Sequence, residues 1–298
     1  MTAAGRFAPS PSGELHVGNL RTAILAWLFA RSTGRAFLLR VEDLDRARAG
    51  AEEEQLRDLA AIGVSWDGAV VRQTDREPLY ATAIERLTGA GLSYECFCTR
   101  REIQEAPSAP HAPQGAYPGT CRNLGDAERA AKRAVRPAAL RLRAEVAQAT
   151  VLDVLHGSFT GVVDDFVLRR NDGVTAYNLA VVVDDAAQGV DQVVRGDDLL
   201  PSTPRQAYLA SLLHIPVPEY AHVPLVLNAD GARLAKRDGA VTLADLAAAG
   251  VPVDRVRDAL LASLGLPAGA LHQALTFFDP AVLPREPWVW AGVGGRDA

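Results

Sequence analysis

The chain has 298 residues, a formal net charge of −5, 48% hydrophobic residues and 22% charged residues. This length supports a sizeable core in one large or two modest domains, and the composition excludes a disordered chain. No apolar stretch approaches the roughly 20 residues of a membrane span, and no secretory signal precedes the first strand, so we expect a cytoplasmic protein. The acidic balance restricts any RNA contact to a local basic patch.

Strands and helices alternate from the N-terminus. A strand over Gly5–Ala8 leads through a turn rich in Pro, Ser and Gly to a helix over about Leu20–Arg31, and Ala36–Val41 is typical of a strand buried in a parallel sheet. Next we expect helices near 52–62 and 77–90 and a strand over 93–97. This order predicts an α/β fold with a doubly wound, Rossmann-like parallel sheet.

Residues 96–122 interrupt the alternation, and they begin what we interpret as an inserted small α+β subdomain. We expect in it a helix over 126–135 and strands near 140–143, 151–155 and 162–168. The parallel-sheet pattern resumes with 176–185, 192–194 and a helix over 204–213; a strand over 223–227, a polar loop over 228–240 and helices near 243–249 and 253–264 follow. The predicted divisions are 1–95 and 171–227 for the two halves of the main domain, 96–170 for the insertion, and 228–298 for the loop and a short helical C-terminal region.

Basic residues are concentrated between positions 100 and 143. This stretch is either an RNA-facing patch or a solvated helix face, and the interleaved Asp126 and Glu128 favour the solvated face.

The turn over 6–21 is a candidate phosphate site. Free N–H groups and the positive end of a helix dipole face the turn, and Gly18 has no Cβ to block a phosphate. His16 is placed to donate a hydrogen bond to a phosphate oxygen. The alternative is a capping loop in which His16 only packs and Asn19 caps the helix.

All three cysteines, Cys96, Cys98 and Cys121, lie within one short window. Together they supply three thiolates of a tetrahedral zinc site, with Tyr117, His111 or water as the fourth ligand. The alternative is three reduced cysteines without a metal.

Several segments resemble the class I aminoacyl-tRNA synthetases in their glutamyl form, over about residues 5–265. Residues 6–21 are similar to the HIGH signature, and Arg-Val-Glu-Asp-Leu-Asp at 40–45 and the long segment over 177–206 are similar to further family blocks. Arg-Leu-Ala-Lys-Arg at 233–237 resembles the KMSKS loop, with Arg233 and Ala235 as departures from the glutamyl form.

The resemblance implies ATP binding by His16, Gly18, Asn19, Arg233 and Lys236. His16 and Lys236 are the implied catalytic residues: His16 at the α-phosphate, and Lys236 at the pyrophosphate leaving group. Arg6 and Arg195 are implied to clamp the γ-carboxylate, which selects glutamate over glutamine by charge. The full implied glutamate site comprises Arg6, Phe7, Ala8, Pro9, Ser10, Glu42, Tyr177 and Arg195, with Glu42 at the α-ammonium group.

The spacing Cys-x-Cys…Tyr-x-x-x-Cys resembles that of the short paralogues of the glutamyl enzymes. It implies a structural zinc ion on Cys96, Cys98, Tyr117 and Cys121. About sixty residues follow Lys236, fewer than the anticodon-binding region of full-length glutamyl enzymes.

The best match is therefore the truncated paralogue, which implies that ATP with Mg²⁺ activates L-glutamate to glutamyl-adenylate. The resemblance further implies that glutamate is then transferred to the queuosine base at the wobble position of tRNA(Asp). We expect a monomer with no membrane partner. The alternatives are a shortened enzyme that charges a tRNA 3′ end, a non-catalytic tRNA-binding paralogue and a small nucleotidylyltransferase.

Overall fold

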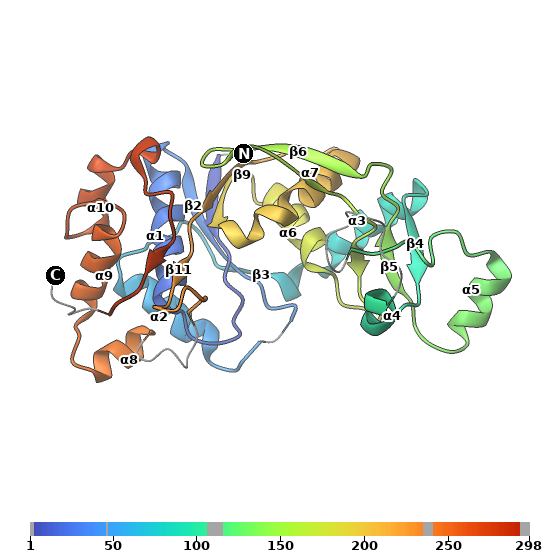
Figure 1. Cartoon of the computed structure of the whole chain (residues 1–298), viewed down its shortest axis with the longest axis horizontal. Helices are drawn as coiled ribbons and strands as arrows, with labels where there is room; N and C mark the ends of the chain where they lie inside the picture. Colours follow the sequence, from blue (N-terminus) through green and yellow to red (C-terminus); the bar gives the residue numbers. More distant parts are fainter. Residues whose placement is uncertain (1–2, 46, 106–115, 235–240, 293–298) are drawn as a thin grey trace.

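The computed structural model describes residues 3–45, 47–105, 116–234 and 241–292, and within these ranges seven strands form the main sheet, in the order β3-β2-β1-β9-β10-β6-β7 (Figure 1). β1 pairs in parallel with β2 on one side and with β9 on the other, and β9 pairs in parallel with β10. The chain thus winds outwards from β1 in both directions, which confirms the predicted doubly wound sheet. The strands span Ala4–Phe7 (β1), Ala36–Val41 (β2), Val71–Arg72 (β3), Gln148–Asp153 (β6), Gly157–Val162 (β7), Val190–Gly196 (β9) and Glu219–Val223 (β10).

Helices cover both faces of this sheet. α1 contacts β1, β2 and β9 on one face and packs against α9, whereas α6 packs on β9 from the other face and contacts α3 and α7. No helix in the described ranges is long and apolar enough to cross a membrane. The helices of this domain span Val17–Ser32 (α1), Ala51–Ala61 (α2), Glu77–Gly89 (α3), Tyr177–Ala187 (α6), Thr203–Leu212 (α7), Leu243–Ala248 (α8), Val253–Ala262 (α9) and Leu271–Ala274 (α10).

The segment over 176–185, expected to continue the sheet, forms helix α6 instead. Its residues from Leu179 to Asp185 are all buried, because the helix lies among β9, α3 and α7. A helix buried on all sides shows no amphipathic period, and the valine run favours a strand by propensity. The sequence pattern therefore did not distinguish this helix from a buried strand.

A separate antiparallel sheet of order β4-β5-β8 forms the small subdomain at the right of Figure 1. The strands β6 and β7, which fall within the expected insertion, pair with each other and join the main sheet beside β10. The expected divisions at 95, 170 and 227 stay predictions. The elements of the subdomain span Ser93–Cys96 (β4), Arg100–Glu105 (α4), Asp126–Arg133 (α5), Ala139–Leu142 (β5) and Val167–Arg169 (β8).

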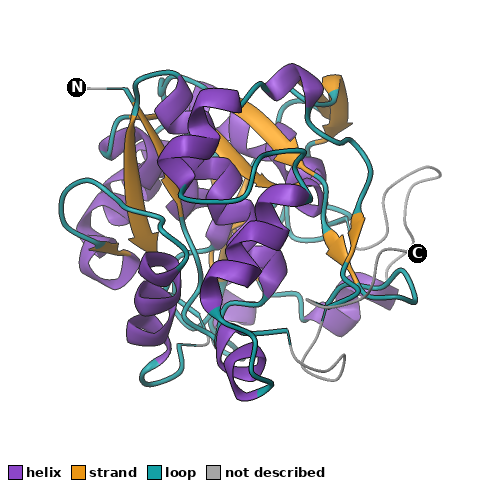
Figure 2. Ribbon diagram, turned by 90° about the vertical axis from the view of Figure 1, so that its left-hand side faces the viewer, coloured by secondary structure: helices purple, strands orange, loops and turns teal. Residues whose placement is uncertain are grey.

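The expected strand over 223–227 is divided at Pro224. β10 ends at Val223, and β11 (Val226–Leu227) pairs in parallel with β12 (Trp288–Val289) near the C-terminus. Proline has no N–H group to continue the ladder of β10, which accounts for the break. Helices α9 and α10 cover the end of the molecule that faces the viewer in Figure 2.

The basic stretch lies on the small subdomain, and acidic side chains balance part of its charge. Arg133 pairs with Glu95 at 2.6 Å, and Arg136 pairs with Glu102 at 3.1 Å. These pairs support the interpretation of a solvated, charge-balanced surface.

Candidate active site

Buried polar side chains gather on the α6 side of the sheet, at the carboxyl ends of its strands. Side chains alternate between the two faces along a strand, so Phe7 and Val194 face α1 whereas Arg6 and Arg195 face α6. His222 of β10 lies on the same face as Arg195 and contacts it. The strand order reverses here, and doubly wound sheets bind their ligands at such a point.

Arg195 is held by three neutral partners. Its Nε donates to Nε2 of His222 at 3.0 Å, its Nη2 donates to the Thr203 hydroxyl at 2.8 Å, and its Nη1 donates to the Tyr177 hydroxyl at 3.3 Å. Arg195 is 5% exposed, and no carboxylate in the described part of the chain pairs with it. A guanidinium has five N–H donors, so these three bonds leave two donors, one on each Nη, for a ligand.

Arg6 and Glu42 belong to an adjacent charged network. Arg6 Nε lies 3.4 Å from Asp185 Oδ1, and the buried Arg40 reaches Asp185 at 2.7 Å and Glu42 at 3.2 Å. Burial raises the pKa of Glu42, and the charges of Arg40 and Arg6 oppose that rise. Unlike Arg195, Arg6 already has a carboxylate partner, so the two arginines of the expected clamp are not equivalent.

Tyr177, the first residue of α6, connects the two groups. Burial raises the pKa of its hydroxyl, and the positive charges of Arg195 and Arg6 both act against this rise. Arg6, Tyr177, Arg195 and Glu42, which were expected to bind glutamate, therefore lie in one site.

The turn after β1 borders this site. Phe7 is buried, Ala8 and Pro9 are half-buried, and Ser10 is exposed. The backbone N–H of Glu42 donates to the carbonyl oxygen of Pro9 at 3.0 Å, which holds the turn beside the end of β2.

His16 caps helix α1. Its Nδ1 accepts hydrogen bonds from the backbone N–H groups of Gly18 and Asn19 at 3.1 Å and 3.3 Å, while the Asn19 side chain accepts from the His16 backbone. The cap is thus His16 and not Asn19, and α1 begins at Val17 rather than at Leu20. Burial lowers the pKa of His16, so the ring is neutral at pH 7. Because Nδ1 accepts, Nε2 carries the proton and is a donor for an anion.

Gly18 makes room for the His16 ring. A Cβ at this position would lie 2.9 Å from Cε1 and 3.0 Å from Nδ1 of His16, and 3.3 Å from Cβ of Val226. The need for glycine here is therefore explained by the cap itself. The expected contacts of Gly18 and Asn19 with ATP stay predictions.

The KMSKS-like segment is anchored beside the start of α1. Lys236 lies outside the described residues. After it, the carbonyl oxygen of Val241 accepts from the N–H of Val17 at 2.8 Å, and before it Arg233 pairs with Asp198 at 2.6 Å. Both flanks of the segment are therefore fixed at the carboxyl edge of the sheet.

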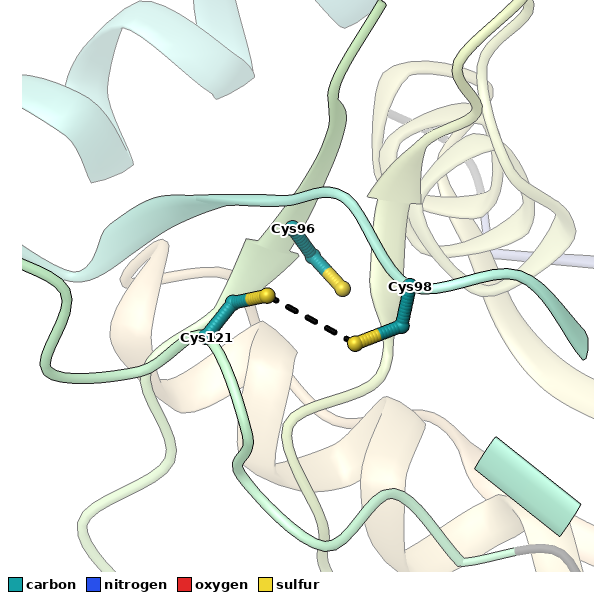
Figure 3. Close-up of side chains that lie close together, drawn as sticks. All are labelled: Cys96, Cys98 and Cys121. Atoms are coloured by element: carbon teal, nitrogen blue, oxygen red, sulfur yellow. Dashed lines mark hydrogen bonds between the residues drawn. The ribbon is translucent and has the colours of Figure 1, made fainter. Parts of the chain in front are cut away.

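The three cysteines converge in the small subdomain, as their spacing predicts (Figure 3). Their sulfur atoms all lie within 4.8 Å of one another, and those of Cys98 and Cys121 are 3.5 Å apart. The Tyr117 hydroxyl oxygen is 3.3 Å from the Cys96 sulfur and 3.7 Å from the Cys98 sulfur. A tetrahedral ion about 2.3 Å from each sulfur places its sulfurs about 3.8 Å apart, so this donor set fits zinc. His111, the other candidate ligand, lies outside the described residues.

Arg141 supplies positive charge to this cluster. Its guanidinium carbon lies 3.7 Å from the centre of the Tyr117 ring. For Cys96, the Tyr117 hydroxyl and the Arg141 charge outweigh burial and lower the thiol pKa, whereas burial raises the pKa of Cys98 to about 12. One of the three cysteines is therefore predisposed to the thiolate form that a metal requires.

Three buried polar residues were not predicted from the sequence: His222 and Thr203, which contact Arg195, and Asp153, which contacts His222. A polar His222 among the apolar residues of β10 is the available signal, since a buried strand rarely carries an imidazole without a partner. The partner itself lies 69 positions away in the chain, where no local pattern indicates it.

Comparisons with known proteins agree with this geometry. Residues 3–278 match the family described as tRNA synthetases class I (E and Q), catalytic domain. A glutamyl-Q tRNA(Asp) synthetase of Nocardia farcinica is 69% identical over 96% of this chain and 92% of its own length. That of Symbiobacterium thermophilum is 47% identical over 95% of this chain and 94% of its own length.

Solved structures are similar over almost the whole chain. A glutamate tRNA ligase of Elizabethkingia meningosepticum, in complex with its amino acid, has a TM-score of 0.83 and 27% identity, over 97% of this chain and 67% of that one. The glutamate-tRNA synthetase of Elizabethkingia anophelis has a TM-score of 0.84 and 27% identity, over 98% and 68%. The chain belongs to the class I tRNA synthetases of the glutamate and glutamine type and, within them, to the glutamyl-Q tRNA(Asp) synthetases.

Proposed function

We propose that the protein activates L-glutamate with ATP and transfers it to the queuosine base of tRNA(Asp). The glutamate α-carboxylate attacks the α-phosphorus of ATP, which enters with Mg²⁺, and pyrophosphate leaves as the P–O bond breaks. Glutamate is then transferred from the adenylate to the base as an ester, and AMP is released. The names of relatives up to 69% identical support this acceptor.

The assignment of glutamate as the amino acid rests on the environment of Arg195. Arg195 is buried, and among the described residues it has only neutral partners and keeps two N–H donors unused, which suits the γ-carboxylate of glutamate. A glutamine amide would leave part of this guanidinium unpaired. We propose that Arg6, Tyr177 and the backbone of the turn over 7–10 complete the pocket, with Glu42 at the α-ammonium group.

For the phosphates, we propose that Nε2–H of His16 donates to the α-phosphate as charge develops there. We assign Lys236 to the pyrophosphate leaving group and Arg233 to the triphosphate, on the basis of the KMSKS-like sequence. These groups act on charge that grows in the transition state, so they affect turnover more than binding.

We propose that Cys96, Cys98, Cys121 and Tyr117 hold a structural zinc ion. Bound zinc would link β4 to the segment before α5, where few apolar side chains pack. The Arg141 guanidinium would balance part of the negative charge of three thiolates and a phenolate.

We further propose a cytoplasmic monomer. Its three cysteines are free, as expected in a reducing compartment.

The test is ATP–pyrophosphate exchange without tRNA, with L-glutamate and L-glutamine compared. Because contacts within the protein already hold Arg195 and Arg6, we expect exchange without tRNA when L-glutamate is supplied, and none with L-glutamine. Equal exchange with glutamine, or none with glutamate, would contradict the proposal.

A further inference from the structure

We propose that Asp153 and His222 are positioning residues for glutamate: through Nε2 of His222 they hold the Arg195 guanidinium so that its two unused N–H donors face the substrate carboxylate. This inference rests on the proposed function, because it names the substrate of the same site. It assigns a role to two residues, Asp153 and His222, that do not themselves contact the substrate but hold Arg195.

The first step is the contact between Asp153 and His222. Asp153 Oδ2 lies 2.6 Å from His222 Nδ1, and both side chains are fully buried. The carboxylate also accepts from backbone N–H groups, at 2.9 Å from Leu155 and 3.0 Å from His156. Asp153 is therefore fixed at the end of β6 and cannot turn away from the imidazole.

The second step is the position of the imidazole proton. An ionised carboxylate only accepts hydrogen bonds, so the proton of His222 lies on Nδ1 and Nε2 is left as an acceptor. Nε2 faces Arg195 Nε at 3.0 Å, and a guanidinium only donates. Burial lowers the pKa of His222 against the opposing effect of Asp153, so the ring is neutral. The tautomer set by Asp153 is thus the one that Arg195 requires.

The third step is the effect on the guanidinium. With Nε bonded to His222 and Nη2 bonded to Thr203, one edge of the planar group is fixed, and Thr203 itself lies 3.0 Å from His222 Nε2. The opposite tautomer would place an N–H group against Arg195 Nε. The guanidinium would then have to rotate, and its free donors would no longer face the substrate.

Asp153→Asn tests whether the position of Arg195 depends on the His222 tautomer. An asparagine amide can donate to Nδ1 and thereby favours the opposite tautomer. We expect KM for glutamate to rise about 10–100-fold, with KM for ATP unchanged, as for loss of hydrogen bonds at a charged group. Asp165→Asn is the matched control, since Asp165 is also buried and accepts a backbone N–H, from Ala144 in the small subdomain. This control should leave KM for glutamate unchanged.

A double-mutant cycle separates positioning from folding. Leucine forms no hydrogen bond, so in His222→Leu the side chain at this position no longer links Asp153 to Arg195. In that background Asp153→Asn should raise KM for glutamate less than threefold, whereas additive effects would overturn the proposal. Nitrogen-15 shifts of His222 should show the Nδ1–H form in the wild type and the Nε2–H form in Asp153→Asn.

The outcomes distinguish the two proposals. Exchange by the wild type together with an unchanged KM for glutamate in a folded Asp153→Asn variant would overturn the positioning role alone. An Nε2–H form in the wild type would also overturn it, whatever the activity. Absence of glutamate exchange in the wild type would overturn the proposed function and, with it, the substrate named here.

Discussion

Replacing Arg195 by leucine removes the charge that we assign to the glutamate γ-carboxylate. Within the described ranges two N–H donors of Arg195 are unused, and each charge-assisted hydrogen bond contributes about 1.5–3 kcal/mol. Together they amount to about 3–6 kcal/mol, or about 10²–10⁴-fold in kcat/KM for glutamate. The fold should persist, because the hydrogen bond between the Thr203 hydroxyl and His222 Nε2, 3.0 Å long, does not depend on the guanidinium.

The assay is pyrophosphate exchange at varied glutamate and at varied ATP. KM for ATP should change less than threefold in Arg195→Leu. Arg35→Leu is the matched control, since Arg35 pairs with Asp191 away from the site and should leave both parameters unchanged. A loss in kcat/KM for glutamate below tenfold, or an equal rise in KM for ATP, would refute the assignment.

Three further predictions concern the phosphate and metal sites. His16→Asn retains a good helix cap but loses the Nε2 donor. The free energy of unfolding should therefore change by less than about 1 kcal/mol, while the rate of adenylate formation falls about 10²–10³-fold. A normal rate of adenylate formation would exclude the donor role. Because burial lowers the pKa of His16 below 6.5, its unfolded form binds protons more readily, and the free energy of unfolding should decline as the pH falls below about 6.5, less so in His16→Asn. Freshly purified protein should contain about one zinc ion per chain, and the Cys98→Ser, Cys121→Ser double variant should not. Full zinc retention in that variant would contradict the assignment of these cysteines as ligands.

The fold could be predicted where local pattern and tertiary position agree. β1, α2, α3 and β4 lie within about three residues of their expected bounds, because turns and apolar periods mark them. The failures are elements whose partners are distant in sequence. The hairpin of β6 and β7 joins the main sheet through a pairing of Asp153 with Tyr220, which no local feature indicates.

The candidate site likewise has parts that the sequence predicts and parts that it does not. The cysteine cluster was predictable because its members lie close together in the sequence: Cys98 follows Cys96 by two positions, and Cys121 follows Tyr117 by four. The structure confirms that the three sulfurs converge. The motifs also identified Arg6 and Arg195, but not that Asp185 already pairs with Arg6 while Arg195 keeps free donors. That difference depends on side chains contributed by α6 and β10, which only the folded chain brings together.

Transfer of labelled glutamate to tRNA(Asp) with and without queuosine, both prepared from the same tRNA transcript, tests the proposed acceptor most directly. We predict that label joins the queuosine-containing tRNA in an ATP-dependent reaction and that tRNA(Asp) without queuosine stays unlabelled. Removal of the 3′-terminal adenosine should not reduce labelling, because the acceptor is the wobble base. Labelling of both tRNAs, or labelling that requires an intact 3′ end, would contradict transfer to queuosine and would assign the protein to tRNA charging instead.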